Sequence, residues 1–531
     1  MKASDASIPD SLIVGSGPAA IAAAQALIKD GRSVLILDTG ISLEPELAAL
    51  KGRMSAQEPE HWSPDDLARW KGRGQGATLR GVDSKTAFGS NFANQVPRQA
   101  APITLVRAKM ARSYSRGGLS NVWGASILPH FEEEIHSWPI PFAEMKAAYS
   151  ALFAFLPQAA WPDALSARLP VAGSEDSGLE PSRLMASLME ALRPHEASLQ
   201  NQGLFFGQAR LAVTHPSSGQ GCRYCGLCMY GCPYDLIYSS SQTLDALISS
   251  NAVEYRAGHL VQTFQEDSSG VRVQGVRLHD GQPFEYRGHR LFLGTGVLET
   301  ARITLRSLGL YNIDWPLLHS DIFLLPILRF RRSRGAMVER SHQMAQLLLE
   351  IQNAAISRRA VHLQFYGYND LYRRALEGML GVLHRPLQPP IAGFLERLMM
   401  VFGYLHSEES SRLSLNLSPA EGGTLRVTGH RNPEAGRIAR RVHGKLFRLW
   451  RELGGLPLWP RLGPPGYGNH SGCSFPMAEK PGAKESDTLG RPAGLKRVHL
   501  VDASVLPSLP ATTITLTVMA NAHRIASIAS R

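Results

Sequence analysis

The chain has 531 residues, of which 44% are hydrophobic and 19% are charged. At about 150 residues per domain this length predicts three domains or fewer. The composition excludes a disordered chain, a fibrous repeat and a disulfide-stapled miniprotein, and no apolar run reaches the roughly 18 residues of a transmembrane helix. The net charge of +11 permits acidic partners, but no nucleic-acid-binding motif accompanies it, so we expect no nucleic-acid partner.

Four of the five cysteines fall within eleven residues, 222–232. Secreted proteins use cysteines as disulfides that staple the fold, so this clustering indicates ligands rather than bridges. The first ten residues contain neither an apolar core nor a twin arginine, and they therefore do not resemble an export signal. We expect a cytoplasmic location.

Residues 11–38 contain, in order, an apolar run, a glycine turn, an alanine-rich stretch, a second apolar run and an acidic residue. This order is typical of a dinucleotide-binding βαβ unit. Gly15 permits the tight turn, Gly17 lets the backbone approach a pyrophosphate, and Ala20 lets the helix pack closely on the strand. The helix N-terminus faces the phosphates, and the Asp38 carboxylate is placed to accept the ribose hydroxyls.

A second set of signals closes the chain. The apolar run at 498–501 predicts a strand that ends at Asp502, and residues 512–528 predict a helix rich in small side chains. The threonines that open this helix leave N–H groups free at its N-terminus, where they stabilise negative charge.

Six features in this order resemble the motifs of the glucose–methanol–choline (GMC) flavoprotein oxidoreductases. The resemblance implies an α/β fold, with a discontinuous Rossmann-like FAD-binding domain and a second, α+β substrate domain built on an antiparallel sheet. The features lie at residues 11–38, 117–125 (GGLSNVWGA), 138–140 (WPI), 294–296 (GTG), 470–477 (HSGCSFPM) and 501–517.

FAD is the cofactor that this resemblance implies. Some sugar-oxidising members attach it through a histidine just before the loop tryptophan, but Val122 stands at that position, so we expect non-covalent FAD. The implied FAD contacts are Gly15, Gly17, Ala20, Asp38, Gly117, Gly118, Ser120, Asn121, Trp123, Asp502 and Thr513.

The family's domain organisation implies that two sets of segments interleave along the chain. We place the FAD-binding domain at 1–160, 205–315 and 460–531, with a cysteine-rich loop at 220–235, and the substrate domain at 161–204 and 316–459.

Within the substrate domain, residues 361–366 alternate apolar and polar side chains, which predicts a strand of the antiparallel sheet. In the family this sheet covers the flavin ring. The polar side chains of His362, Gln364 and Tyr366 therefore either contact the substrate or face water.

Residues 371–405 predict two apolar helices separated by prolines, with Leu395, Leu398, Met399 and Phe402 at helical spacing on one face. Three interpretations remain open for this segment: core packing, a lid, or an amphipathic element that contacts a membrane surface. The last would place the protein peripherally at the inner membrane face.

The spacing C-x2-C-x2-C-x3-C-P matches the bacterial ferredoxin run, and it is formed by Cys222, Cys225, Cys228 and Cys232. Thiolates are soft ligands that suit iron–sulfur clusters, zinc or copper(I). Because no second run is present, Cys232 either joins the same cluster (4Fe–4S), stays free (3Fe–4S) or is replaced by Cys473. Structural zinc and free or bridged thiols remain alternatives.

A flavin that oxidises an alcohol needs a base for the hydroxyl proton, and histidine suits this task near neutral pH. By resemblance that base is His470. The family's second histidine or asparagine corresponds to Thr513, which is no base at neutral pH. Either Thr513 orients the substrate, or Asn469, His406 or Tyr366 takes the second role.

These features together predict an FAD-dependent enzyme that oxidises a small-molecule alcohol, with a sugar-like compound as the preferred class. An iron–sulfur cluster would pass electrons singly to an external acceptor, which favours a dehydrogenase. The alternatives are an alcohol oxidase that uses oxygen and an electron-relay flavoprotein without alcohol chemistry.

Overall fold

The computed structural model describes residues 8–72, 85–171, 177–384, 386, 388–420 and 423–531. Within these residues the N-terminal strand lies at the centre of a five-stranded parallel sheet, in the order β21-β9-β1-β2-β5. Its four strands other than the edge strand β5 are mostly apolar and buried, as expected for a parallel sheet covered on both faces. The strands of the sheet span Ser11–Val14 (β1), Val34–Leu37 (β2), Glu254–Arg256 (β5), Arg290–Leu293 (β9) and Val498–Leu500 (β21).

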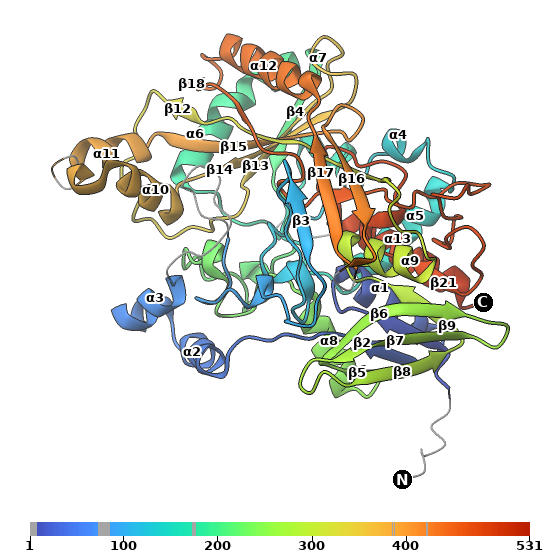
Figure 1. Ribbon diagram of the computed structural model, residues 1–531. Coiled ribbons are helices and arrows are strands. Elements are labelled where there is room, and N and C mark those ends of the chain that lie inside the picture. The colour runs from blue at the N-terminus through green and yellow to red at the C-terminus, as the bar shows by residue number, and fades with distance from the viewer. Residues whose placement is uncertain (1–7, 73–84, 172–176, 385, 387, 421–422) are drawn as a thin grey trace.

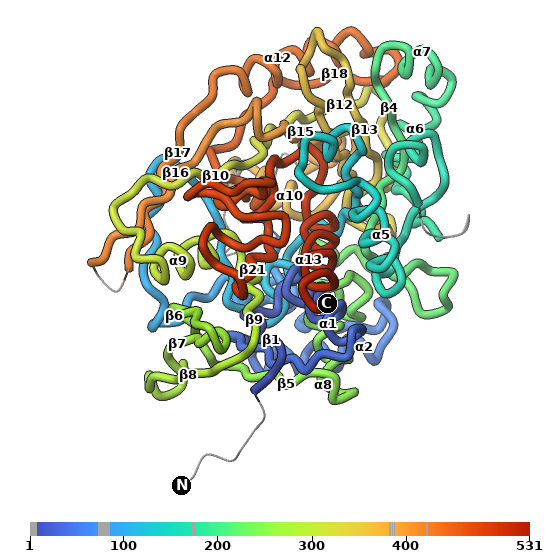
Figure 2. The backbone as a smooth tube through the Cα atoms, turned by 90° about the vertical axis from the view of Figure 1, so that its right-hand side faces the viewer, coloured from blue at the N-terminus to red at the C-terminus, as the bar shows by residue number. Residues whose placement is uncertain are grey.

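Two helices from opposite ends of the chain pack against each other beside this sheet, α1 (Pro18–Lys29) and α13 (Thr515–Ala529) (Figure 2). Alanines give α1 high helix propensity and a thin face, and Pro18 at its first position is compatible with a helix start. The C-terminal helix that the sequence predicts is present as α13. It begins at Thr515, three residues later than expected.

A three-stranded antiparallel sheet lies alongside the parallel sheet, and α9 packs on it (Figure 1). These elements span His259–Glu266 (β6), Val271–Arg277 (β7), Pro283–Gly288 (β8) and Val297–Ser307 (α9). Further α-helices that precede β6 in the chain span Pro45–Ser55 (α2), Pro64–Lys71 (α3), Glu132–Ile135 (α4), Phe142–Phe153 (α5) and Ser240–Ser249 (α8).

A mostly antiparallel sheet of five strands, β20-β10-β16-β17-β3, brings together segments that are distant in the sequence. Its only parallel pair joins β17 and β3, and its short strand β20 directly follows His470. The strands span Ser471–Gly472 (β20), Trp315–His319 (β10), Arg412–Leu417 (β16), Leu425–His430 (β17) and Ile103–Val106 (β3).

An eight-stranded antiparallel sheet forms the upper part of the molecule in Figure 1. Its main path is β18-β12-β15-β14-β13-β4, and β11 pairs with both β15 and β19. The strands span Gly455–Pro457 (β18), Ile327–Arg329 (β12), Leu398–Leu405 (β15), Val361–Tyr366 (β14), Leu347–Ile351 (β13), Leu204–Gln208 (β4), Ile322–Leu324 (β11) and Arg461–Leu462 (β19).

The apolar face of this sheet packs on helix α12 (Pro433–Arg448) in one buried cluster. Val361, Leu363 and Phe365 point into that cluster, which confirms the predicted alternation along β14. Helices α6 (Arg183–Leu192) and α7 (Glu196–Asn201) complete its cover. The domain boundaries given above stay a prediction.

The prediction of two helices between residues 371 and 405 is only partly correct. Helices α10 (Asp370–Leu380) and α11 (Gln388–Leu395) are present at one end of the molecule (Figure 1), but residues 398–405 form the central strand β15. A strand that is buried on both faces of a sheet is apolar throughout and shows no alternation of apolar and polar residues. The helical spacing of the apolar residues at 395–402 therefore does not indicate a helix. Residues 385 and 387 of this segment lie outside the described residues. In the part that the structure describes, no helix has the length and apolar character needed to cross a membrane.

Candidate functional site

Two glycine loops meet at the carboxyl ends of the parallel strands. Gly15 has a φ of +98°, and a Cβ there would lie 2.7 Å from the Gly294 carbonyl oxygen. A Cβ on Gly294 would in turn lie 2.9 Å from the Cβ of Ala20, so helix α1 touches the end of β9 as the sequence predicted. A Cβ on Gly118 would lie 3.4 Å from the Gly17 Cα, which places the second glycine loop directly on the first.

Ser16 holds the two loops and the predicted acidic residue together. Its hydroxyl accepts a hydrogen bond from the Gly117 N–H (2.9 Å) and donates one to the Asp38 carboxylate. The Tyr255 hydroxyl donates to the same carboxylate at 3.1 Å. Asp38 is only 6% exposed, and burial raises the pKa of its carboxyl to about 6.

The predicted loop residues mainly fix the loop's own shape. Asn121 donates through its amide to the Arg116 and Gly118 carbonyls at 2.9 and 2.8 Å, and the Ser120 hydroxyl donates to the Gly117 carbonyl. The Trp123 indole N–H donates to a backbone carbonyl of the neighbouring segment.

The closing strand contributes Asp502 to the same edge of the parallel sheet. Its carboxylate accepts from the Thr300 hydroxyl (2.5 Å) on α9 and from the Ser504 N–H (2.9 Å). Burial raises the pKa of Asp502. The two predicted acidic residues, Asp38 and Asp502, therefore follow strands on opposite sides of β1.

This arrangement fits a dinucleotide. Gly17 is the N-cap of α1 and offers no side chain to the first-turn N–H groups, which therefore stay available for phosphate oxygens. The close loop contacts leave no room for a side chain at Gly15, and this lets the backbone line the site.

His470 directly precedes strand β20 and lies against the eight-stranded antiparallel sheet. Its ring stacks on Tyr404 of β15, with centroids 5.1 Å apart. Its Nδ1 is buried and has no hydrogen-bond partner among the described residues. Burial, with a smaller effect from His362, lowers the pKa of His470 to about 4, so the ring is neutral near pH 7.

Two further histidines converge near His470, and the sequence identified only one of them. His406 accepts the Glu408 N–H at Nδ1 (3.1 Å), so its proton lies on Nε2, which faces a Glu134 carboxylate oxygen at 3.3 Å. His130 was missed because it lies hundreds of residues away in the sequence. Burial and the nearby His406 and His470 lower the pKa of His130 to about 3, and its buried Nε2 has no partner in the described part of the chain.

The other two predicted catalytic residues make local contacts. The Thr513 hydroxyl donates to the Ser126 carbonyl at 3.0 Å, while its neighbour Thr512 lies 3.4 Å from Nδ1 of His130. Asn469 is exposed, and its amide oxygen accepts the Ala111 N–H at 3.2 Å. The structure thus places His130, rather than Asn469, beside the closing threonines.

The polar face of β14 is turned inward. His362 and Gln364 are 0% and 2% exposed, and the Tyr366 hydroxyl lies beside Gly124 at the end of the glycine loop, where a Cβ would be 4.0 Å away. Of the two interpretations that the alternation left open, contact with water is therefore wrong for His362 and Gln364.

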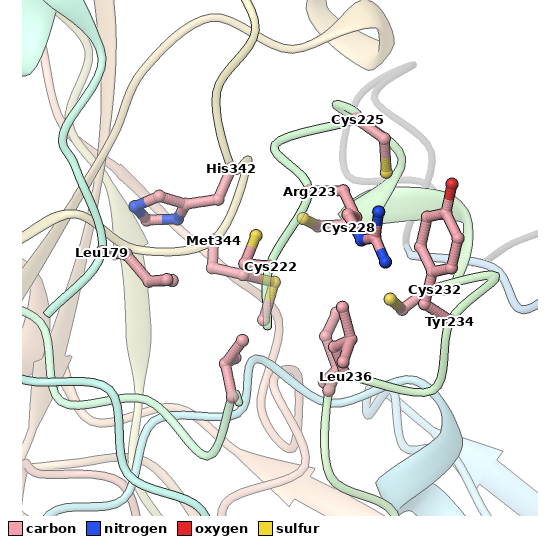
Figure 3. Close-up of a pocket in the computed structure, with 12 residues that line it drawn as sticks. Leu179, Cys222, Arg223, Cys225, Cys228, Cys232, Tyr234, Leu236, His342 and Met344 are labelled. Carbon is pink, nitrogen blue, oxygen red and sulfur yellow. The ribbon is translucent and has the colours of Figure 1, made fainter. Parts of the chain in front are cut away.

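The four clustered cysteines line one small cavity, with Arg223 and Tyr234 beside them (Figure 3). All four are free thiols, and so is Cys473, which is buried elsewhere in the main core. Among the described residues no group of three or more His, Cys, Asp or Glu side chains has an arrangement that would hold a metal ion. The cavity lining is completed by Leu179, Val213, Leu236, Ile237, His342 and Met344.

Lys85 connects this cavity to the second glycine loop. Its ammonium group donates to the Trp123 carbonyl at 2.9 Å and lies close enough to Cys228 and Cys232 to interact with their charges. The cysteine cavity and the loop that carries the predicted FAD contacts are therefore neighbours.

The raised pKa of Asp38 predicts that the folded state loses stability as the pH rises. The folded protein keeps a proton on Asp38 up to about pH 6, whereas the unfolded chain loses it near the ordinary value of 3.8. Rising pH between these values therefore destabilises the folded state. We expect cofactor-free Asp38→Asn to unfold at a higher temperature than wild type at about pH 8, and the difference to shrink toward about pH 4, as thermal unfolding would show.

Asp10 provides the matched control for this measurement. Hydrogen bonds from Ser33 lower the pKa of Asp10, so Asp10→Asn should destabilise the protein at about pH 8 instead. An Asp38→Asn variant that is no more stable than wild type at that pH would contradict the assignment of a buried, costly carboxylate.

The chain matches no protein-family model and no curated protein. It is similar to the solved structure of pyridoxine 4-oxidase from Mesorbium loti, with 15% identity, 98% of each chain covered and a TM-score of 0.58. It is also similar to formate oxidase, with 14% identity, 99% of each chain covered and a TM-score of 0.63. A variant of the Aspergillus oryzae formate oxidase, studied for FAD modification, matches with 12% identity, 99% of each chain covered and a TM-score of 0.61.

These likenesses extend over nearly the whole chain at low sequence identity, and they concern the fold. They agree with the parallel sheet, the glycine loops at its edge and the antiparallel sheet above it. The chain has a mixed α/β fold like that of these oxidases, with a parallel, Rossmann-like sheet and a large antiparallel sheet.

Proposed function

We propose that this protein binds FAD non-covalently and oxidises an alcohol group of a small molecule to a carbonyl group. The observation that carries this proposal is His470, a neutral ring that stacks on Tyr404 of the antiparallel sheet and has a buried nitrogen without a partner among the described residues. FAD, when bound, accepts the hydride from the alcohol carbon.

The glycine loops supply the binding part of this proposal. The first-turn N–H groups of α1 would hold the pyrophosphate, and the Asp38 carboxylate would accept the ribose hydroxyls. Val122 precedes the loop tryptophan and carries no group that can bond covalently to a flavin.

His470 supplies the base. Because its pKa of about 4 lies well below neutral pH, the ring is unprotonated and accepts the hydroxyl proton as the alcohol is oxidised. Thr513 cannot take this role, since a threonine hydroxyl is no base at neutral pH. His130 is the nearest alternative to the family's second base, because its Nε2 is also unpartnered in the described part of the chain.

The electrons would then leave for an external acceptor. The four clustered thiols do not lie in a metal-holding arrangement in the described structure, but we propose that they would rearrange to hold an iron–sulfur cluster that would serve as the first carrier. Four soft ligands on one cavity support this, as does the contact of Lys85 with the neighbouring glycine loop. The alternative is direct transfer to oxygen, which the similarity to pyridoxine 4-oxidase and formate oxidase favours.

Replacing the base tests the central step. We expect His470→Ala to lose about 10²–10⁴-fold in kcat while it keeps its FAD, because the variant leaves the predicted FAD contacts at the glycine loops unchanged. His279→Ala, a change at an exposed turn of the small antiparallel sheet, should retain full activity. Steady-state kinetics and flavin content measured on all three proteins decide this.

The same assignment determines the pH profile of the wild-type protein. With the pKa of His470 at about 4, kcat/KM for an alcohol should stay constant through neutral pH and fall only as the pH approaches that value. A His470→Ala variant with normal turnover, or an acid limb near the ordinary pKa of histidine, would contradict His470 as the base.

Non-covalent binding predicts that denaturation releases the cofactor. Heating or acid precipitation should leave yellow flavin in the supernatant and a colourless pellet, because Val122 offers no attachment atom. Absorption spectra of the two fractions measure this directly. A pellet that stays yellow would refute it.

The cluster proposal predicts iron in protein that is purified without oxygen. Iron and acid-labile sulfide should be present, and Cys225→Ser should lower the iron content without removing FAD. Cys473→Ser is the matched control, because Cys473 is buried outside the cavity. Iron-free wild-type protein with normal flavin would contradict the cluster and favour transfer to oxygen.

A further inference from the structure

A row of four polar side chains crosses the inward face of the antiparallel sheet. Glu350 on β13 pairs directly opposite His362 on β14, and Gln364 and Tyr366 follow on the same face. The first three are 0%, 0% and 2% exposed, whereas Tyr366 at the end of the strand is only partly buried.

The hydrogen bonds along this row all run in one direction. The Tyr366 hydroxyl donates to Gln364 Oε1 at 2.8 Å, and Gln364 Nε2 donates to His362 Nε2 at 3.0 Å. Because an amide nitrogen only donates, His362 Nε2 is the acceptor and its ring proton lies on Nδ1. That proton points to Glu350 Oε1 at 2.5 Å, so the row ends on a carboxylate.

The direction of the row leaves the Tyr366 oxygen as an acceptor. Burial raises the pKa of Tyr366, so the phenol keeps its single proton, and Gln364 takes that proton in a hydrogen bond. The oxygen lone pairs remain available beside Gly124 of the glycine loop. On the same sheet face Tyr404 lies opposite His362 and stacks on His470, which connects this face to the proposed base.

Folding alone does not require such a row. A fully buried carboxylate and imidazole are costly to desolvate, and apolar side chains of similar volume often serve stability as well or better. The opposite face of β14 already contributes Val361, Leu363 and Phe365 to the hydrophobic core. A buried polar row that ends at a partly open hydroxyl therefore points to recognition.

We infer that Glu350, acting through His362 and Gln364, holds the Tyr366 oxygen as a hydrogen-bond acceptor for a donor group on the substrate other than the hydroxyl that is oxidised. This inference rests on the proposed function and adds a requirement to it. The substrate class is an alcohol that carries a second hydroxyl or an amine. Tyr366 contacts that group, and Glu350 is a positioning residue.

The test compares glycerol with 1-propanol, which has the same carbon count and lacks the extra donors. Wild-type holoprotein should prefer glycerol in kcat/KM, and Tyr366→Phe should lower the glycerol-to-1-propanol ratio of kcat/KM about tenfold or more. Glu350→Gln should act in the same direction, because a neutral amide can donate to His362 and reverse the row. Tyr311→Phe, at a tyrosine outside the site, is the matched control.

Binding provides a readout that does not depend on turnover. Saturation-transfer NMR on the holoproteins should show glycerol contact in wild type and Tyr311→Phe, and weaker contact in Tyr366→Phe and Glu350→Gln at equal flavin content and unfolding temperature. If neither alcohol reduces the flavin, the proposed alcohol chemistry fails for this pair, and the binding data alone then decide the inference. Equal glycerol binding, or an unchanged kcat/KM ratio in Tyr366→Phe, would overturn it.

Discussion

The close contact between two glycine loops at the edge of the parallel sheet is the constraint on which the rest of the structure depends. The Ser16 hydroxyl joins the Gly117 N–H to the Asp38 carboxylate, and Gly15 lies against Gly294 with no room for a side chain. Segments from three distant parts of the chain meet there. A buried carboxylate with a raised pKa is the cost of that arrangement, and a ligand with hydroxyl donors would offset it.

Around the histidines and the antiparallel sheet, burial of polar side chains determines which atoms carry protons. Burial keeps His470 and His130 neutral, and neutral imidazoles accept protons. The row that ends on Glu350 determines in the same way which atoms of Tyr366 remain available. The proposed function assigns binding, proton transfer and substrate recognition to three separate structural units.

The sequence predicts well what local spacing determines. The order from β1 to Asp38, the alternation along β14 and the shared cavity of the four cysteines all follow from residues close in the chain. It fails where long-range pairing decides: residues 398–405 become a strand because two neighbours cover it. Neither the pairing of Glu350 with His362 nor the approach of His130 to His470 leaves any local signal.

The most direct test of the account is the anaerobic absorption spectrum of the flavin during addition of primary and secondary alcohols, with and without deuterium at the reacting carbon. The account predicts that an alcohol bleaches the flavin bands and that deuterium slows the bleaching, because that C–H bond breaks in the step. Flavin that dithionite bleaches but that no alcohol reduces would contradict it.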